Sequence, residues 1–581
     1  MFQRVVFFLL LFNQVAFGQK SVYEYDTLKY KYATLGELDS LDLATRLFSS
    51  SFLFPEESSN IYTIQPKQIV YPGNSIYSFS NSNANKLVFS ALPHIGFGYS
   101  FGAKATQKLD FDYEQAFKHG FLINASINNF KTDGFFRNTG AQNSLYQLAV
   151  ARNGKWHSFQ LRARTLKVQR NWNGGIQNDS LVQDFTPDLR PVWKENAQSI
   201  YKNATILLSN KFSVINDSVK QIGFETIHKY DRFKRFYSEE DSISSLYSIV
   251  NFDSTRTSDS LLQESLNNNL GLFFNTRQIK LESGVSSSYW NYRSFGYRND
   301  TLELGIYSQI EIRMTKFKLV QTGNFNLLGA ANGFHNNLGF SGNFFGFDVN
   351  ASHFIMNELP VVSQRFFYSN NVAYKTANLE KQLFQNLTAQ LGRSFGKQTI
   401  QLAYELGQYD KVFQYDSQQL IWRNDLNASK GNYQQISIKS KLNWRWLNCH
   451  LNYQFTAMDD IKRFVPTHLI DTRLFVKGGI FKAKKLKALA GIDFLIASSY
   501  KRLNFVPQMT LFDLEGSILN SSSNGFMNMA AFASFEVETF RFFIRMDNLA
   551  YFWQDKQIEL VSGYAFPSTQ LKVGITWDFW N

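Results

Sequence analysis

Most of the chain repeats one pattern, in which apolar and polar residues alternate. From Lys86 to Asn581, segments of roughly 9 to 14 residues with a period of two are separated by polar turns. Leu109 to Glu114, Ile306 to Met314 and Ile436 to Asn443 are examples in which most alternate positions are apolar. Because successive side chains of a strand point to opposite faces, each segment predicts a strand with one apolar and one polar face.

The length of these segments favours strands that cross a membrane. Soluble strands usually have ~5 to 6 residues, whereas a tilted transmembrane strand needs ~9 to 11. Asp133-Gly134, Asn332-Gly333 and Asn524-Gly525 are typical turn pairs between segments. The pattern predicts an all-β fold, a single antiparallel transmembrane barrel of roughly 22 to 24 strands, uncertain by several, after a short irregular N-terminal segment. A soluble β-sandwich or β-helix also alternates, but its strands would be shorter.

The polar face of the predicted barrel carries charged residues that would be costly in contact with lipid. We expect them to line the lumen, where facing charges of both signs tune ion preference. The predicted lumen-facing residues are Asp110, Asp112, Glu114, Arg162, Arg164, Glu311, Arg313, Lys439, Lys441, Lys572 and Asp578.

Composition agrees with a transmembrane barrel and argues against a helical membrane protein and a nucleic-acid-binding protein. Aromatic residues make up 16% of the chain, a load that is costly to expose to water, while the mean hydropathy is only −0.27. Beyond the N-terminus no run approaches the ~18 to 20 apolar residues of a membrane-spanning helix. The net charge of +13 is spread along the chain without a basic run or nucleic-acid motif, so no nucleic-acid partner is expected. The positive total favours a pore with a weak preference for anions.

Two kinds of local sequence indicate where segments end. Aromatic groups at Tyr289 to Tyr292, Trp444 to Trp446 and Tyr551 to Trp553 are placed as interfacial girdles would be. The polar stretch Ser238 to Asn269 is predicted to be an extracellular loop, since periplasmic turns are short.

The N-terminus has the features of a secretory signal peptide over residues 1–18. Arg4 precedes the apolar stretch Val5 to Phe12, and Ala16 and Gly18 are the small residues that a signal peptidase reads. Residues 19–85 are irregular and are expected to be a periplasmic or lumen-inserted segment, followed by the barrel over 86–581. The only cysteine, Cys449, leaves the chain without an internal disulfide.

The last strand alternates from Leu571 to Phe579 and ends in Trp580 and Asn581. It resembles the terminal signal by which the barrel-assembly machinery recognises outer-membrane proteins, with Trp577, Phe579 and Trp580 as the signal residues. That signal normally ends on Phe itself, whereas two residues follow Phe579 here.

The whole chain resembles the putative porin family of Bacteroidetes outer membranes. The resemblance rests on Phe111-Asp112-Tyr113, Asp133-Gly134-Phe135-Phe136 and Trp172-Asn173-Gly174-Gly175-Ile176, and on Ser562 to Pro567 before the last strand. These are strand and turn signatures without catalytic residues. The resemblance implies an outer-membrane barrel of a Gram-negative bacterium.

Chemistry-bearing motifs are sparse. The eight histidines are scattered singly, without metal-ligand spacing, so no metal or cofactor is expected. His157-Ser158 and Ser352-His353 are adjacent, but neighbours on a strand point to opposite faces. An outer-membrane lipid hydrolase assembled from separate strands remains a minor alternative, and the chain is not expected to be an enzyme.

The predicted function is passive diffusion of small hydrophilic solutes through the barrel. One alternative is a TonB-dependent-type transporter, but Gln19 to Asn85 is short for the plug domain of well over a hundred residues that such transporters carry. The other is a barrel that partners a surface complex. Expected partners are outer-membrane lipid and lipopolysaccharide, the barrel-assembly machinery and small solutes; the identity of the solute, the gating and the oligomeric state stay open.

Overall fold

The computed structural model describes most of the chain from the first strand onward. The described residues are 87, 90–177, 185–186, 189–240, 247, 249–329, 332–360, 362–375, 380–416, 421–424, 429–458, 465–481, 485–502, 504–509, 511–513, 522–553, 559–565 and 567–580. The predicted signal peptide and the segment 19–85 lie outside these residues.

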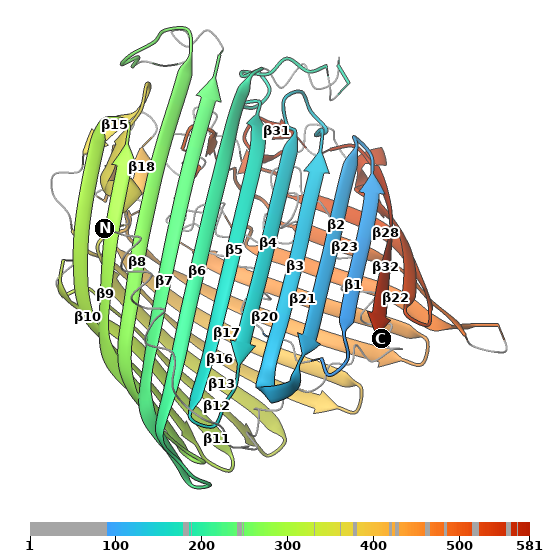
Figure 1. The fold of residues 1–581 in the computed structure, drawn as a ribbon. Helices are drawn as coiled ribbons and strands as arrows, with labels where there is room; N and C mark the ends of the chain where they lie inside the picture. Colours follow the sequence, from blue (N-terminus) through green and yellow to red (C-terminus); the bar gives the residue numbers. More distant parts are fainter. Residues whose placement is uncertain are drawn as a thin grey trace.

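The fold is a single barrel of 22 antiparallel strands (Figure 1). Its strands, in chain order, are β1 (His94–Gly102), β2 (Thr106–Ala116), β3 (Phe121–Thr132), β4 (Ala141–Arg152), β5 (His157–Trp172), β6 (Ala197–Asn216), β7 (Lys220–Glu239), β8 (Thr257–Thr276), β9 (Ile279–Ser294), β10 (Tyr297–Arg313), β11 (Phe317–Leu328), β12 (Phe334–Phe344), β13 (Phe347–Glu358), β16 (Gln382–Phe395), β17 (Gln398–Asp410), β20 (Gly431–Trp444), β21 (Leu447–Met458), β22 (His468–Ile480), β23 (Leu486–Ala497), β28 (Phe526–Val537), β29 (Phe540–Asp547) and β32 (Gln570–Trp580).

The first and last strands pair with each other and close the barrel. In the register of β1 and β32, His94 lies opposite Trp580 and Gly102 opposite Lys572. Closure satisfies the backbone hydrogen bonds of both strands, which would otherwise form exposed edges. The prediction of one all-β barrel with about 22 to 24 strands is confirmed.

The two ends of the barrel differ in their connections. At the end where β1 begins and β32 ends, the strands are joined by short turns, and we call it the turn end. At the other end, the loop end, six connections are long: those between β5 and β6, β7 and β8, β13 and β16, β17 and β20, β23 and β28, and β29 and β32.

The connections contain short elements of their own. One 3-10 turn lies at the turn end, η1 (Lys118–Gly120). The loop-end connections hold α7 (Val362–Arg365), β14 (Phe366–Tyr368), β15 (Ala373–Lys375), β18 (Gln414–Asp416), β19 (Ile421–Arg423), β24 (Tyr500–Lys501), β25 (Asn504–Val506), β26 (Leu511–Asp513), β27 (Ser522–Ser523), η4 (Leu549–Phe552), β30 (Glu559–Val561) and β31 (Tyr564–Ala565). Among the described residues, no helix has the length and apolar character needed to span a bilayer.

One wall of the barrel is taller than the rest (Figure 1). Strands β6, β7 and β8 each have 20 residues, about twice what a membrane crossing needs. The prediction that Ser238 to Asn269 forms a loop is therefore wrong, because β8 begins at Thr257 and only the residues between Glu239 and Thr257 connect the strands. The start of β8 is polar on both faces, so alternation could not reveal it.

The apolar face of the strands points outward. Leu571 is 48% exposed, whereas its neighbour Lys572 is 3% exposed. At the turn end, aromatic rings of neighbouring strands form a continuous outer row: the ring centroids of His157 and Phe212 lie 4.3 Å apart, and those of Phe212 and Phe224 lie 4.8 Å apart. Such a row suits the membrane interface.

The predicted girdle groups have different positions in the structure. Trp444 and Trp446 are exposed at the turn between β20 and β21, while Phe552 and Trp553 are exposed in a loop-end connection. Tyr292 is fully buried and packs against loop residues, so its prediction as a girdle residue is wrong. Its strand, β9, continues to a level where the loops fold against it.

Candidate functional site

Part of the inner wall is a ladder of paired charges. The ladder uses residues of β22, β23, β29 and β32, with β28 lying between β23 and β29. Arg473 and Arg545 both bind the carboxylate of Asp493, with Arg545 Nη1 to Asp493 Oδ2 at 2.6 Å. Arg545 Nε and Lys572 Nζ each donate to Asp547 at 2.6 Å. All five groups are largely hidden from solvent, so each charge needs its partner.

A second charged group lies where the barrel closes. Arg541 bonds Glu536 at 3.1 Å and Asp578 at 2.8 Å. His94 on β1 lies between Asp578 of β32 and Glu114 of β2, at 3.3 and 3.2 Å. Five strands around the seam, β28, β29, β32, β1 and β2, are thus joined by side chains as well as by backbone hydrogen bonds.

Other residues predicted to face the lumen lie near the seam and on β10. Asp110 and Asp112 lie opposite Gly98 and Gly96 of β1, in the row that continues to Thr576 and Asp578. Glu311 is 6% exposed and bonds Arg313 and Lys318.

Arg162 and Arg164 are half-buried on β5. Their side chains alternate with Leu161, which is exposed on the outer face.

A cavity of about 960 Å³ opens at the turn end, along β10 to β22. Lys439 and Lys441 of β20 lie in its wall, and both are exposed. In the register, Lys439 is flanked by Gln401 and Asn452, and Lys441 by Thr399 and His450. The cavity wall is therefore polar and rich in hydrogen-bond donors.

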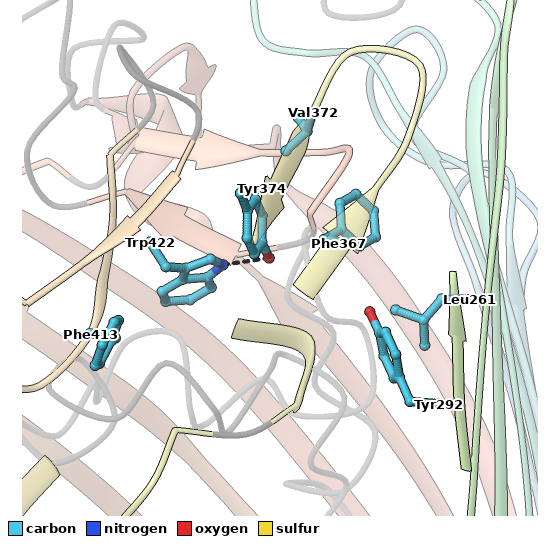
Figure 2. Close-up of a cluster of buried hydrophobic side chains, with 7 residues drawn as sticks. All are labelled: Leu261, Tyr292, Phe367, Val372, Tyr374, Phe413 and Trp422. Atoms are coloured by element: carbon cyan, nitrogen blue, oxygen red, sulfur yellow. Dashed lines mark hydrogen bonds between the residues drawn. The ribbon is translucent and has the colours of Figure 1, made fainter. Parts of the chain in front are cut away.

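An apolar cluster that we call the mouth cluster lies at the loop end (Figure 2). Its buried residues come from two barrel strands and from two loop-end connections: Leu261, Tyr292, Phe367, Val372, Tyr374, Phe413 and Trp422. Trp422 Nε1 donates a hydrogen bond to Tyr374 Oη at 2.7 Å, and Tyr292 Oη donates to the carbonyl of Phe366 at 2.7 Å. The loops between β13 and β16 and between β17 and β20 consequently fold into the barrel mouth.

The connection between β23 and β28 reaches across the mouth. It contributes Val506 and Met509 to the edge of the mouth cluster. Its Phe505 ring packs on Trp172 at the end of β5, with centroids 4.7 Å apart. Its Gln508 lies beside Tyr247 of the β7–β8 connection, which is nearly opposite in the strand order.

Tyr247 belongs to a buried polar group at the rim. Its hydroxyl donates to Glu239 at 2.7 Å, and Lys194 forms an ion pair with the same carboxylate at 2.5 Å. Burial, and the negative charge of Glu239 after it, hold the pKa of Tyr247 far above its usual value, so the phenol stays neutral. The group ties the β5–β6 connection to the β7–β8 connection.

Three of the sequence motifs, widely separated in the chain, meet beside these loops. Phe135 and Phe136, Ile176, and Ala565 form one buried cluster. The amide of Ile176 donates to the carbonyl of Gly563 at 2.9 Å. In the sequence these motifs are recognisable only as turn signatures, because nothing local indicates that they pack together.

We find no metal site among the described residues. None of them form a group of three or more His, Cys, Asp or Glu side chains able to hold a metal ion. His157 stacks on Phe212 and contacts Asn210 at 3.3 Å, whereas Ser158 donates to Asn153 at 2.8 Å. The adjacent pair thus has separate partners.

Comparison with known sequences now identifies the family. The family described as "Putative porin" matches residues 15–581. The chain belongs to the Putative porin family. It lies in the outer membrane, where its apolar outer face contacts lipid. No curated protein matches the sequence.

Solved structures share the fold of this Putative porin barrel at low sequence identity. The copper transporter OprC has a TM-score of 0.60 and 11% identity, covering 84% of this chain and 81% of its own. The siderophore receptor PirA from Acinetobacter baumannii has the same score and identity, covering 85% and 81%. A ferric enterobactin receptor (PfeA) mutant from Pseudomonas aeruginosa has a TM-score of 0.60 and 10% identity, covering 84% and 81%.

Proposed function

We propose that this barrel is a porin-like channel through which small hydrophilic solutes diffuse passively across the outer membrane. The observation that carries the proposal is the polar inner wall, which opens into a cavity of about 960 Å³ at the turn end. A closed barrel keeps its backbone satisfied in hydrocarbon while its interior stays polar. Short turns face the periplasm in such barrels, so the cavity would open on that side.

The mouth cluster would set the size limit on the outer side. Its loops are held by buried aromatic contacts and by the Trp422 to Tyr374 hydrogen bond. An ordered constriction of this kind admits small solutes and excludes larger ones.

Conductance of the purified full chain in a planar bilayer tests the proposal. We expect discrete current steps, together with liposome permeability that falls as the size of an uncharged sugar increases. A protein that is folded, inserted and silent would contradict passive diffusion.

A second candidate is a transporter of the TonB-dependent type. Two observations favour it: the loops that fold into the mouth and the fold shared with a copper transporter and a siderophore receptor. Deletion of residues 19–85 separates the two candidates. If this segment is a plug, deletion should make a silent barrel conduct, whereas a porin should conduct about equally with and without it.

As part of the porin proposal, we also propose that the chain is not an enzyme. We propose further that the barrel-assembly machinery recognises β32. Support for the second point is the position of β32 as the strand that closes the barrel on β1.

A further inference from the structure

The turn-end cavity has an excess of basic side chains. Six basic residues line it against two acidic ones: Arg313, Lys316, Lys318, Arg393, Lys439 and Lys441 against Asp348 and Asp471. Elsewhere on the inner wall, cations such as Arg545 and Lys572 are matched by carboxylates.

Several of these basic groups already have partners. Arg313 and Lys318 both bond Glu311, at 2.5 and 3.0 Å. The guanidinium of Arg393 lies over the rings of Phe347 and Phe395, at 4.6 and 4.7 Å. The charges of Arg313 and Lys318 are therefore partly neutralised by Glu311, and the guanidinium of Arg393 is held against aromatic rings.

Lys439 and Lys441 differ from these residues. In the described part of the chain neither forms an ion pair with a carboxylate, and both side chains are exposed in the cavity wall. They lie two residues apart on β20 and share one face. Their two ammonium groups thus place a local positive potential inside a cavity with low-dielectric walls, which focuses the field.

The residues beside the two lysines complete a donor surface. Across β17 and β21, the flanking partners are Gln401 and Asn452 for Lys439, and Thr399 and His450 for Lys441. Directly opposed residues of antiparallel strands have Cβ atoms about 4.5 to 5.5 Å apart. Amide side chains therefore flank Lys439, and a hydroxyl and an imidazole side chain flank Lys441, on the same face of the sheet.

We infer that Lys439 and Lys441 form a binding station for small solutes that carry a phosphate or carboxylate group. Ammonium groups bind such oxyanions as point charges, and neighbouring neutral donors replace part of the lost hydration. The station lies in an open cavity, so binding is weak enough for the solute to leave. The inference names the solute class of the proposed channel and rests on that function for transit, although binding itself does not require it.

The test compares three forms of the full chain in neutral phosphatidylcholine bilayers, which supply no anionic lipid. They are the wild type, Lys439→Gln/Lys441→Gln, and the control Lys397→Gln/Lys430→Gln, which loses the same charge at exposed positions outside the cavity wall. The wild type and the control should be anion-selective in a KCl gradient, and inorganic phosphate should reduce their chloride current. In Lys439→Gln/Lys441→Gln, the phosphate concentration that halves the chloride current should be about tenfold higher than in the wild type.

Phosphate binding is also measured without conduction, from ³¹P line broadening on the folded protein in detergent. Broadening should be lost in Lys439→Gln/Lys441→Gln and kept in Lys439→Arg/Lys441→Arg, which preserves the charge. Equal phosphate effects in the wild type and the glutamine variant would overturn the station even if the channel conducts. A silent barrel whose phosphate binding depends on the two lysines would overturn passive diffusion and leave the station intact.

Discussion

Gly175 and Gly563 lie in direct backbone contact: a Cβ added to Gly563 would be 3.2 Å from the Cα of Gly175. They belong to turns in the β5–β6 and β29–β32 connections, which are far apart in the chain and meet at the loop end of the barrel. Both glycines have positive φ, +93° and +77°, and the amide of Ile176 bonds the carbonyl of Gly563 at 2.9 Å beside them. Two turn motifs are thus joined at a point where a side chain has neither conformational freedom nor space.

Gly563→Ala should destabilise the barrel more than an ordinary substitution of a positive-φ glycine. The matched control is Gly346→Ala, since Gly346 has φ +79° and a Cβ added there would meet no heavy atom within 4 Å. In both variants an alanine must adopt a positive φ, which lowers the stability of each. Only in Gly563→Ala does the added methyl group also overpack, which should lower the free energy of unfolding by about another 1 to 3 kcal/mol. Urea unfolding in detergent measures the difference, and equal losses would show that the contact is unimportant.

Opening the mouth cluster should raise conductance. Trp422 is 6% exposed and donates a hydrogen bond to Tyr374. Trp422→Ala therefore leaves a cavity and should lower the stability of the mouth cluster by about 3 to 5 kcal/mol. We expect larger current steps, passage of larger sugars and faster proteolysis of the loops. Phe552→Ala is the control, because Phe552 is a loop aromatic that is 71% exposed. Unchanged steps in the folded Trp422→Ala variant would show that the cluster does not limit the pore.

Removing one carboxylate from the charge ladder should destabilise the closing strand. Asp547→Asn removes the carboxylate paired with Lys572 and one of the two carboxylates paired with Arg545, both cations being less than a tenth exposed. Breaking a buried pair on one side costs about 3 to 5 kcal/mol. Asp300→Asn should cost less than about 1 kcal/mol, because its pair with Arg298 is exposed. Unfolding in urea compares the two, and similar values would contradict a buried, dry ladder.

Asp253 in the β7–β8 connection should stay ionised to unusually low pH. Hydrogen bonds from the hydroxyl and the amide of Thr255 lower the pKa of the Asp253 carboxyl to about 2. Because the folded pKa is depressed, the stabilisation of this turn is fully present above the ordinary value near 3.8 and is lost as pH falls through about 2.

Carbon-13 NMR of the Asp253 carboxyl during an acid titration measures this pKa. Thr255→Val should bring it back toward its ordinary value, while Thr301→Val on β10 should leave it unchanged. A wild-type midpoint near 4 would contradict the hydrogen-bonded turn.

Much of the fold could be predicted because alternation is a local property. In Leu571 to Phe579, whether a side chain faces lipid or the interior depends only on its parity along the strand. The same rule predicted the polar faces of β2, β10 and β20. It failed at the start of β8, where Thr257 to Ser260 are polar on both faces. It also failed at Tyr292, whose aromatic ring packs against loops rather than lipid.

Alternation was sufficient to predict a transmembrane barrel of roughly 22 to 24 strands, uncertain by several, with an apolar outside and a charged inside, since each strand carries that information in its own residues. Other relationships became visible only in three dimensions: Gly175 meets Gly563, Phe505 reaches Trp172, and Lys439 lies in an open cavity while Lys572 is paired. They depend on barrel closure, which brings distant strands and loops together, and no local pattern records which of them will meet.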